Sequence, residues 1–251
     1  MNAPGDSRRE IRHALIAVAA VFLLLAVLGA VSAILPFVSH NLGVLVAAGF
    51  LLASVSVAHL RAEDIAADHG FWSDRPAREL VFGLAAAAVV FPLFTVGFAG
   101  FYATACGDGG VGQAVAHALP RGLCARYAGF GDGGGGPGAL DLLRLLGIQL
   151  VVVAIPEELF FRGTVHGLLE RAIPPTRRLF GGGIGWALIA SSVLFALAHV
   201  IVTPDPRRLA VFFPALLFGW MRSATRSILP AAFVHAAANL LLYILFATTF
   251  S

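Results

Sequence analysis

Long apolar runs alternate with short polar segments along the whole chain. Each run is continuous, and about 20 predominantly apolar residues are what a helix needs to cross a bilayer. Seven runs approach this length: 13–35, 41–60, 79–103, 141–168, 184–202, 208–224 and 228–249. Because an open sheet cannot satisfy its backbone hydrogen bonds in lipid, we expect each run to be a helix. The pattern predicts an all-α, polytopic membrane helical bundle of about seven transmembrane helices.

Composition agrees with a membrane protein and argues against nucleic-acid binding. Of the 251 residues, 59% are hydrophobic and only 12% are charged, whereas a soluble domain carries about 25% charged residues. The net charge is only +3, and the arginines fall mainly at the ends of apolar runs. This is the usual distribution beside membrane spans. The lipid bilayer is therefore an expected partner, and nucleic acid is not.

The first apolar run imitates a secretory signal but is too long to be one. It extends from about Ala14 to Leu35, whereas the apolar core of a signal peptide has about 7–15 residues. We therefore predict an uncleaved first transmembrane helix.

Arginine placement predicts the orientation of the spans. Four groups of arginines fall on one side of a seven-span chain, in segments 8–12, 61–78, 171–178 and 222–226. Four others fall on the opposite side and weaken the assignment: Arg121, Arg126, Arg207 and Arg208. The glycine- and alanine-rich composition suggests a bacterium with GC-rich DNA. The predicted location is the bacterial inner membrane, as a multi-pass protein with a cytoplasmic N-terminus.

Residues 104–139 would then form an outward-facing loop that carries both cysteines, Cys106 and Cys124. On the oxidising side of a membrane, two cysteines in one loop can form a disulfide, and two unpaired thiols are the alternative. The glycine-rich segment 131–138 in the same loop predicts a flexible linker.

Two adjacent carboxylates, Glu157 and Glu158, lie inside the fourth apolar run. An acidic residue at the centre of a membrane helix costs about 2.5–3.5 kcal/mol on insertion scales, and it therefore indicates a functional site. Residues at positions i and i+4 share a helix face, so Glu158 is expected to pair with Arg162 and leave Glu157 with a free carboxylate. Pro156 precedes the pair and either kinks the helix or is simply tolerated there.

Three further polar side chains lie inside later apolar runs. His199 stands alone in its run, and His235 precedes Asn239 by one helical turn. A satisfied core histidine and hydrogen-bonding between helices are the structural alternatives to function at these positions. His166 lies near the end of the fourth run, where we expect a solvated helix end and no catalytic role.

Together these groups fit hydrolysis. A carboxylate that is removed from water binds protons more readily and is a better general base. Histidine and asparagine side chains can donate hydrogen bonds to an oxyanion. No serine or cysteine stands beside them in a recognisable nucleophile motif, which favours water as the nucleophile. The same residues could instead bind zinc, although the sequence H-E-x-x-H is absent, and the residues alone leave both chemistries open.

Three motifs carry a family resemblance. They are E-E-x-x-x-R at Glu157, Glu158 and Arg162, F-x-x-x-H at Phe195 and His199, and H-x-x-x-N at His235 and Asn239. In this order, each on its own apolar segment, they resemble the CPBP family of intramembrane proteases, which includes the CAAX-processing Ras-converting enzyme and bacterial Abi proteins.

The resemblance covers roughly residues 140–248, and it divides the chain into two expected domains. Residues 1–139 would hold N-terminal transmembrane helices and an external glycine-rich loop. Residues 140–251 would form a CPBP-like catalytic helical core in the last four spans.

The resemblance also implies a role for each site residue. Glu157 would activate the hydrolytic water, and His199 would position or polarise it. His235 and Asn239 would form an oxyanion hole, and Glu158 with Arg162 would orient the site. The implied enzyme is an intramembrane glutamate-type endopeptidase that needs no cofactor, with a zinc-dependent version of the same protease as the alternative.

The expected substrate is a membrane-anchored protein or peptide. Prenylated CAAX ends, bacteriocin-like peptides and C-terminal anchor tails all fit, and oligomeric state is not predicted. A non-catalytic bacteriocin self-immunity or binding protein is the alternative from another class. A proton-coupled carrier would also use intramembrane Glu and His, but no repeated halves are visible in the sequence.

Overall fold

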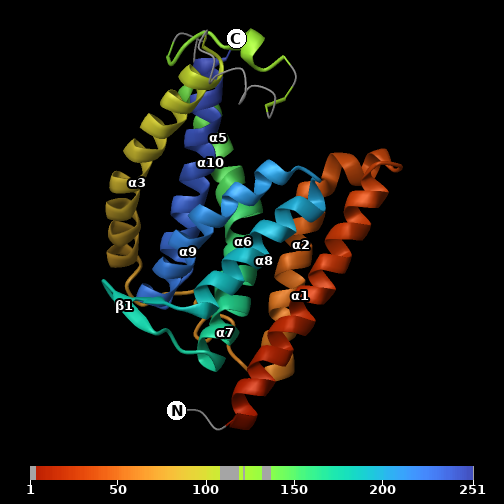
Figure 1. The fold of residues 1–251 in the computed structure, drawn as a ribbon. Helices are drawn as coiled ribbons and strands as arrows, with labels where there is room; N and C mark the ends of the chain where they lie inside the picture. The colour runs from red at the N-terminus through yellow and green to blue at the C-terminus, as the bar shows by residue number, and fades with distance from the viewer. Residues whose placement is uncertain (1–3, 108–118, 121, 132–136, 251) are drawn as a thin grey trace. The chain divides into compact units, whose positions relative to one another are not determined.

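The computed structural model describes residues 4–107, 119–120, 122–131 and 137–250. Most of the glycine-rich segment 131–138, for which a flexible linker is predicted, lies outside the described residues. The described chain forms helices α1 (Pro4–Ser32), α2 (Pro36–Arg61), α3 (Pro76–Ala105), α5 (Ala139–Ile148), α6 (Ile155–Glu158), α7 (Gly167–Ala172), α8 (Trp186–Val202), α9 (Phe212–Thr225) and α10 (Leu229–Thr249). The predicted all-α helical bundle is confirmed (Figure 1).

Five helical segments are long and apolar enough to cross a membrane: Asp6–Ser32, Pro36–Arg61, Pro76–Ala105, Ala139–Ala172 and Leu229–Thr249. The chain is therefore a multi-pass integral membrane protein. The other two apolar runs form the shorter helices α8, of 17 residues, and α9, of 14 residues. At 1.5 Å per residue, these are about 26 Å and 21 Å long. Both are shorter than the hydrocarbon core of about 30 Å.

Contacts divide the chain into two compact units, Met1–Gly83 with Leu150–His235, and Leu84–Gln149 with Ala236–Ser251. We call them unit 1 and unit 2. The expected domain boundary between residues 139 and 140 comes from family resemblance and stays a prediction.

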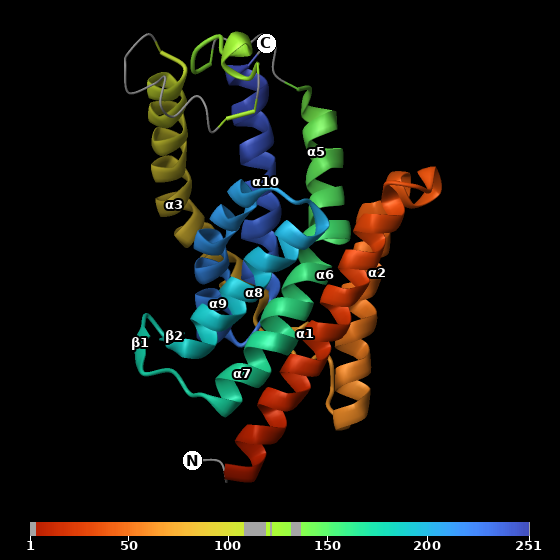
Figure 2. The same ribbon diagram turned by 45° about the vertical axis from the view of Figure 1, so that its right-hand side comes forward.

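In unit 1, α1 packs on α2 along one side and on α7 and α8 along another (Figures 1 and 2). The apolar core lies among these helices and is built around four aromatic rings. The Phe50 ring lies 5.4 Å from both the Phe160 and the Phe161 ring, and Phe161 meets Phe195 at 5.1 Å. Because Phe160 and Phe161 directly follow the acidic pair, their burial fixes the part of the helix that carries it.

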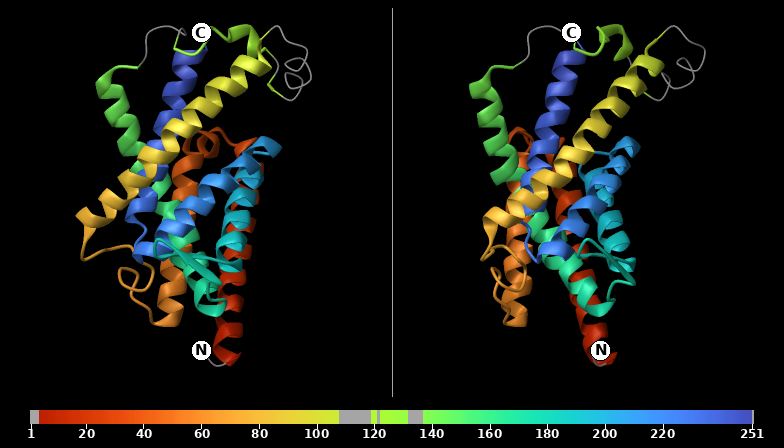
Figure 3. Two further views of the ribbon diagram at one scale, coloured as in Figure 1. Left: turned by 60° about the vertical axis from the view of Figure 1, so that its left-hand side comes forward. Right: turned by 90° about the vertical axis from the view of Figure 1, so that its left-hand side faces the viewer.

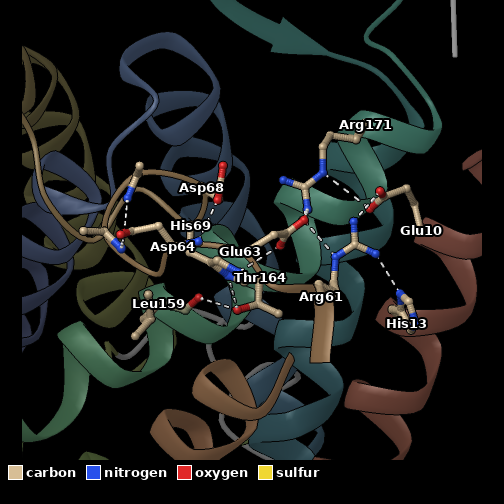
Figure 4. A network of polar contacts seen from close by, with 12 residues as sticks. Glu10, His13, Arg61, Glu63, Asp64, Asp68, His69, Leu159, Thr164 and Arg171 are labelled. Atoms are coloured by element: carbon tan, nitrogen blue, oxygen red, sulfur yellow. Dashed lines mark hydrogen bonds and ion pairs between the residues drawn. The ribbon is translucent and has the colours of Figure 1, made fainter. Parts of the chain in front are cut away.

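A polar network at the end of the same helices also holds this segment (Figure 4). Glu63 accepts from Arg61 and Arg171, at 2.8 Å and 3.1 Å, and lies 3.2 Å from His69 Nε2. The other ring nitrogen of His69 lies 2.9 Å from Thr164 Oγ1. Burial lowers the pKa of His69 below its usual value, and the nearby Glu63 carboxylate opposes this shift. The network thus joins the end of α2 to the helical segment that follows the acidic pair.

A two-stranded antiparallel hairpin follows α7 and was not expected from the sequence. Strand β1 (Arg177–Leu179) pairs with β2 (Gly182–Ile184). Phe180 and Gly181 have positive φ angles of 49° and 85°, as a tight two-residue hairpin turn requires. The indole of Trp220 donates to Leu179 O at 2.8 Å and fastens the hairpin to α9.

Unit 2 contains most of α3, the helix α5, the short 3₁₀ helix η1 (Cys124–Arg126) and the end of α10 (Figure 3). Its core is an aromatic cluster in which the Phe98 ring lies 4.7 Å from Tyr102 and 5.2 Å from Phe246. Cys106 and Cys124 form a disulfide with their Cα atoms 5.0 Å apart. Of the two possibilities that the sequence left open for these cysteines, the structure has the bridge.

The close approach of the His69 loop to Gly163 generates a stability prediction. A Cβ atom at Gly163 would lie 2.7 Å from His69 O and 3.2 Å from a Leu159 methyl carbon. Overpacking of this kind costs about 1–3 kcal/mol, so Gly163→Ala should lower the midpoint of thermal unfolding of the detergent-solubilised protein. Gly147→Ala is the matched control, because a Cβ there meets nothing within 4 Å. An unchanged midpoint for Gly163→Ala would contradict the packing of the loop on this helix.

Candidate active site

The helix that carries the acidic pair is irregular at the site. Two π-helical segments, η2 (Gln149–Ala154) and η3 (Leu159–His166), flank the single α-helical turn α6, which contains Pro156. Proline has no backbone N–H and cannot continue a regular ladder. The Thr164 hydroxyl donates to Leu159 O, five residues earlier, at 3.3 Å. π-helical turns are rare and occur frequently at functional sites, so the backbone itself marks this segment.

Glu158 lies at the centre of a buried polar group. Its Oε2 lies 3.1 Å from Arg162 Nε, which is the pair expected from the i, i+4 spacing. Its Oε1 lies 2.9 Å from His235 Nδ1. Glu158 is 0% exposed and Arg162 is 1% exposed. The carboxylate therefore joins the helix of the acidic pair to α10, although the two residues are 77 positions apart in the chain.

Arg162 is enclosed by aromatic rings and a backbone carbonyl. Its guanidinium carbon lies 4.1 Å from the Phe195 ring centroid and 5.3 Å from that of Phe218. One Nη atom donates to Ala215 O at 3.3 Å. Cation–π contacts of this kind stabilise a cation that has lost its water. Arg162 is therefore a fixed structural charge between α8 and α9.

Glu157 faces two imidazole rings. Its Oε2 atom lies 3.9 Å from His199 Nε2 and 3.9 Å from His235 Nε2. The same oxygen is buried and forms no hydrogen bond with the described residues. These separations are too long for direct hydrogen bonds and fit a single bridging water. The two carboxylates thus differ, because Glu158 contacts Arg162 and His235 at 3.1 Å and 2.9 Å, whereas Glu157 has no contact of that length with either imidazole.

The environment of His199 fixes which of its nitrogens carries the proton. Nδ1 lies 2.9 Å from Phe195 O. A backbone carbonyl only accepts, so Nδ1 must be the donor. In the neutral ring, Nε2 then presents a lone pair toward Glu157. The Phe195 ring also packs on the imidazole, with centroids 4.5 Å apart.

His235 is held between a carboxylate and an aromatic ring. Glu158 Oε1 contacts Nδ1 of His235. The Phe218 ring stacks on the imidazole, with ring centroids 5.0 Å apart and an interplanar angle of 17°. Phe218 was missed by sequence reasoning, because nothing distinguishes it from other phenylalanines of the apolar runs. The stacking leaves Nε2 as the only polar edge of His235 that faces Glu157.

Asn239 follows His235 by one turn of α10 and belongs to unit 2. Within that unit, its amide nitrogen donates to Gln149 Oε1 at 2.8 Å. Gln149 orients the Asn239 carboxamide and was also missed. Its signal in the sequence was available, since it is a lone amide inside an apolar run.

The expectation for His166 was wrong. Instead of lying at a solvated helix end, it is 1% exposed. The helix continues through α7 to Ala172, and α9 covers the ring. The cover is close because Gly219 has no side chain there. A Cβ at Gly219 would lie 3.4 Å from His166 Nδ1, which has no hydrogen-bond partner among the described residues.

The arrangement is suited to proton transfer. Glu157 Oε2, which has no hydrogen bond with the described residues, faces the lone pair of His199 Nε2 and also faces His235. The His235 ring is held by the buried Glu158–Arg162 ion pair. Within the described ranges, no group of three or more His, Cys, Asp or Glu side chains is arranged to hold a metal ion.

Comparison with known proteins supplies one match. Residues 139–241 match the model of the family described as type II CAAX prenyl endopeptidase, Rce1-like. The matched segment contains Glu157, Glu158, Arg162, His199, His235 and Asn239, and it ends just after Asn239. The match confirms the family resemblance that the three motifs carry. No curated protein and no solved structure matches the chain.

The contrast between the two glutamates generates a prediction on stability. Glu158→Gln removes the charge that neutralises Arg162, and breaking one partner out of a buried ion pair costs about 3–5 kcal/mol. The midpoint of thermal unfolding in detergent should therefore fall strongly. Glu157→Gln makes the same chemical change one residue earlier, where no hydrogen bond is lost, and should leave the midpoint nearly unchanged. Equal effects of the two substitutions would contradict the different environments assigned to the two carboxylates.

Proposed function

We propose that residues 139–241, which belong to the Rce1-like family of type II CAAX prenyl endopeptidases, form the active site of an intramembrane peptidase that uses Glu157 as its general base. The observation that carries this proposal is the position of Glu157 Oε2, which lies 3.9 Å from the Nε2 atom of both His199 and His235. A general base must lie within one water of the proton that it abstracts, and this geometry meets that requirement.

The nucleophilic water would be oriented by two acceptors. Glu157 Oε2 would accept one of its protons, and the lone pair on His199 Nε2 would accept the other. The oxygen lone pairs of the water would then point toward the substrate carbonyl. As the C–O bond forms, Glu157 takes the proton, and the carbonyl becomes an oxyanion. Glu157 then gives that proton to the leaving nitrogen as the C–N bond breaks, which completes hydrolysis without a covalent enzyme intermediate.

The oxyanion would be stabilised by His235 and Asn239. His235 can donate from Nε2 while Nδ1 donates to Glu158 only if its ring is an imidazolium. Preorganised donors of this kind contribute more to rate in a dry site than in water. Asn239 would supply the second donor, with its carboxamide oriented by Gln149.

The substrate would be a peptide bond in a membrane-anchored protein or peptide. The family acts on prenylated CAAX ends, and such an end is one candidate here. The catalytic groups lie on apolar helices of a multi-pass protein, so a substrate held in the membrane by its own anchor would reach them more readily than a soluble one. We propose the bacterial inner membrane as the location, with the N-terminus cytoplasmic. The Cys106–Cys124 disulfide supports an oxidising environment for the loop after α3.

Two alternatives keep the same site and change its use. Zinc accepts histidine nitrogen and carboxylate oxygen, which would make the protein a metallopeptidase. A bacteriocin self-immunity or other binding role would need the fold but not the proton-transfer groups.

The first test replaces the proposed base. Glu157→Gln keeps the size of the side chain but cannot accept the proton, and loss of a general base typically lowers the rate by about 10²–10⁴-fold. We expect protein termini that appear in membranes of a complemented deletion strain to be absent when Glu157→Gln is supplied. Asp141→Asn is the matched control, because it also replaces a carboxylate by a carboxamide within the span Ala139–Ala172, at a side chain that is 70% exposed. Near-native cleavage by Glu157→Gln would remove Glu157 from this role, and protection from a bacteriocin that survives in Glu157→Ala/His199→Ala would favour the binding role.

The second test separates the glutamate-type mechanism from the zinc-dependent one. We expect the purified protein to keep its cleavage activity after dialysis against EDTA and phenanthroline, with less than stoichiometric zinc by mass spectrometry of the dialysed protein. Activity that is lost on dialysis and restored by one equivalent of zinc would establish the metallopeptidase instead.

A further inference from the structure

A cavity of about 450 Å³ lies in unit 1, where α7 and α9 end. It shares no residue with the proposed active site. Half of its lining residues are charged: Asp68, Glu170, Arg171, Arg178, Arg222 and Arg226. Arg171 and Arg222 lie in the last turns of α7 and α9, and Arg226 caps the end of α9. A cavity of this size can hold a small polar ligand or the head of a larger one.

Arg222 forms the buried part of this cavity. It is only 6% exposed, although it is a guanidinium group. Its single hydrogen bond is a long one of 3.5 Å to the backbone oxygen of Asp68, and its Nε atom is buried without a partner. It makes no salt bridge with any residue of the described ranges. A buried cation without an anion in direct contact is unfavourable.

Glu170 and the buried Glu79 act on Arg222 electrostatically, but neither forms an ion pair with it. The two carboxylates of the cavity lining each have another hydrogen-bond partner. Glu170 accepts from the Ser223 hydroxyl, and Asp68 accepts from the backbone N–H of Asp64 at 2.7 Å. Glu10 and Glu63 are committed to Arg61 and Arg171 in the network of Figure 4.

The remaining arginines lie at the rim. Arg178 and Arg226 are exposed, and one Nη atom of Arg178 donates to Gly181 O at 3.0 Å. With Arg222 they make three guanidinium groups against the two carboxylates of Asp68 and Glu170. The lining of the cavity therefore carries more positive than negative groups, and its buried end is Arg222, which forms no ion pair with the described residues.

We propose that this cavity binds a phosphate group through Arg222, Arg226 and Arg178. A guanidinium group presents a planar fork of N–H donors that matches the oxygens of a phosphate. The arginines lie at helix ends, on the side of the chain that the arginine distribution assigns to the cytoplasm, where anionic lipid headgroups accumulate and basic pockets between helices bind them. The phosphate can come from such a headgroup or from free phosphate. The proposal does not depend on the peptidase function.

The test measures binding to the full-length protein in a mild detergent. The probes are phosphatidylglycerol, phosphatidylcholine and inorganic phosphate, and the readouts are bound lipid by native mass spectrometry and the shift of the unfolding midpoint. We expect phosphatidylglycerol to bind more tightly than phosphatidylcholine. Each basic residue near an anionic surface contributes roughly a fivefold factor in affinity, so Arg178→Gln/Arg226→Gln should weaken phosphatidylglycerol binding about twentyfold.

Two further variants make the result decisive. Arg222→Gln tests the buried end of the cavity. If that protein does not fold, Arg178→Gln/Arg226→Gln, called the rim variant, provides the test. Arg144→Gln is the matched control, because its side chain is 69% exposed and lies outside the cavity. Inorganic phosphate that reproduces the stabilisation and is lost with the rim variant would identify free phosphate as the source. Equal binding of the two lipids with no response to phosphate, or binding that the rim variant leaves intact, would overturn the proposal.

Discussion

The geometry of the candidate site depends on one buried carboxylate. Glu158 is completely buried and lies between the guanidinium of Arg162 and the imidazole of His235. In a medium of low dielectric, the carboxylate or the guanidinium would be costly alone, and their pairing lowers that cost. The carboxylate thereby sets the direction of the His235 ring. It also leaves Glu157, which comes one residue earlier and points about 100° away on the helix, as the acid that is not used for structure.

Aromatic side chains also hold the polar groups of the site in place. Phe195 gives its backbone oxygen to His199 and its ring to both His199 and Arg162. Phe218 covers the face of His235 and the other side of Arg162. These rings exclude water from the ion pair and restrain the imidazoles. The site is therefore supported by residues that have no proton to exchange, while Glu157 Oε2 faces two imidazole nitrogens at 3.9 Å.

Much of this arrangement could be predicted from the sequence. Apolar runs of membrane length gave the helices, and the rarity of acids in such runs indicated the site. The spacing of Glu158 and Arg162 gave their contact. Whether Glu157, His199, His235 and Asn239 perform the roles assigned by resemblance stays a prediction.

Other features had no local signal in the sequence. The burial of His166 depends on Gly219, which is far away in the chain, and Phe218 resembles every other apolar residue of its run. The hairpin of Arg177–Ile184 is too short and too rich in glycine and arginine to show a strand pattern. The π-helical register depends on tertiary packing around Pro156. The hydrophobic pattern of a sequence reports which residues share a face of one helix or strand. These features depend on contacts between different elements.

The spacing of Glu158 and Arg162 has a consequence for the insertion of the protein into the membrane during its synthesis. Helices enter the membrane in the order of their synthesis, and His235 is made 77 residues after Glu158. During that interval the fourth span has to lie in lipid without its final partner. Glu158 and Arg162 are one turn apart on this span, so they can neutralise each other before His235 is present. The span then enters the membrane with a single uncompensated charge. That charge belongs to Glu157, whose two imidazole neighbours, His199 and His235, are both synthesised later.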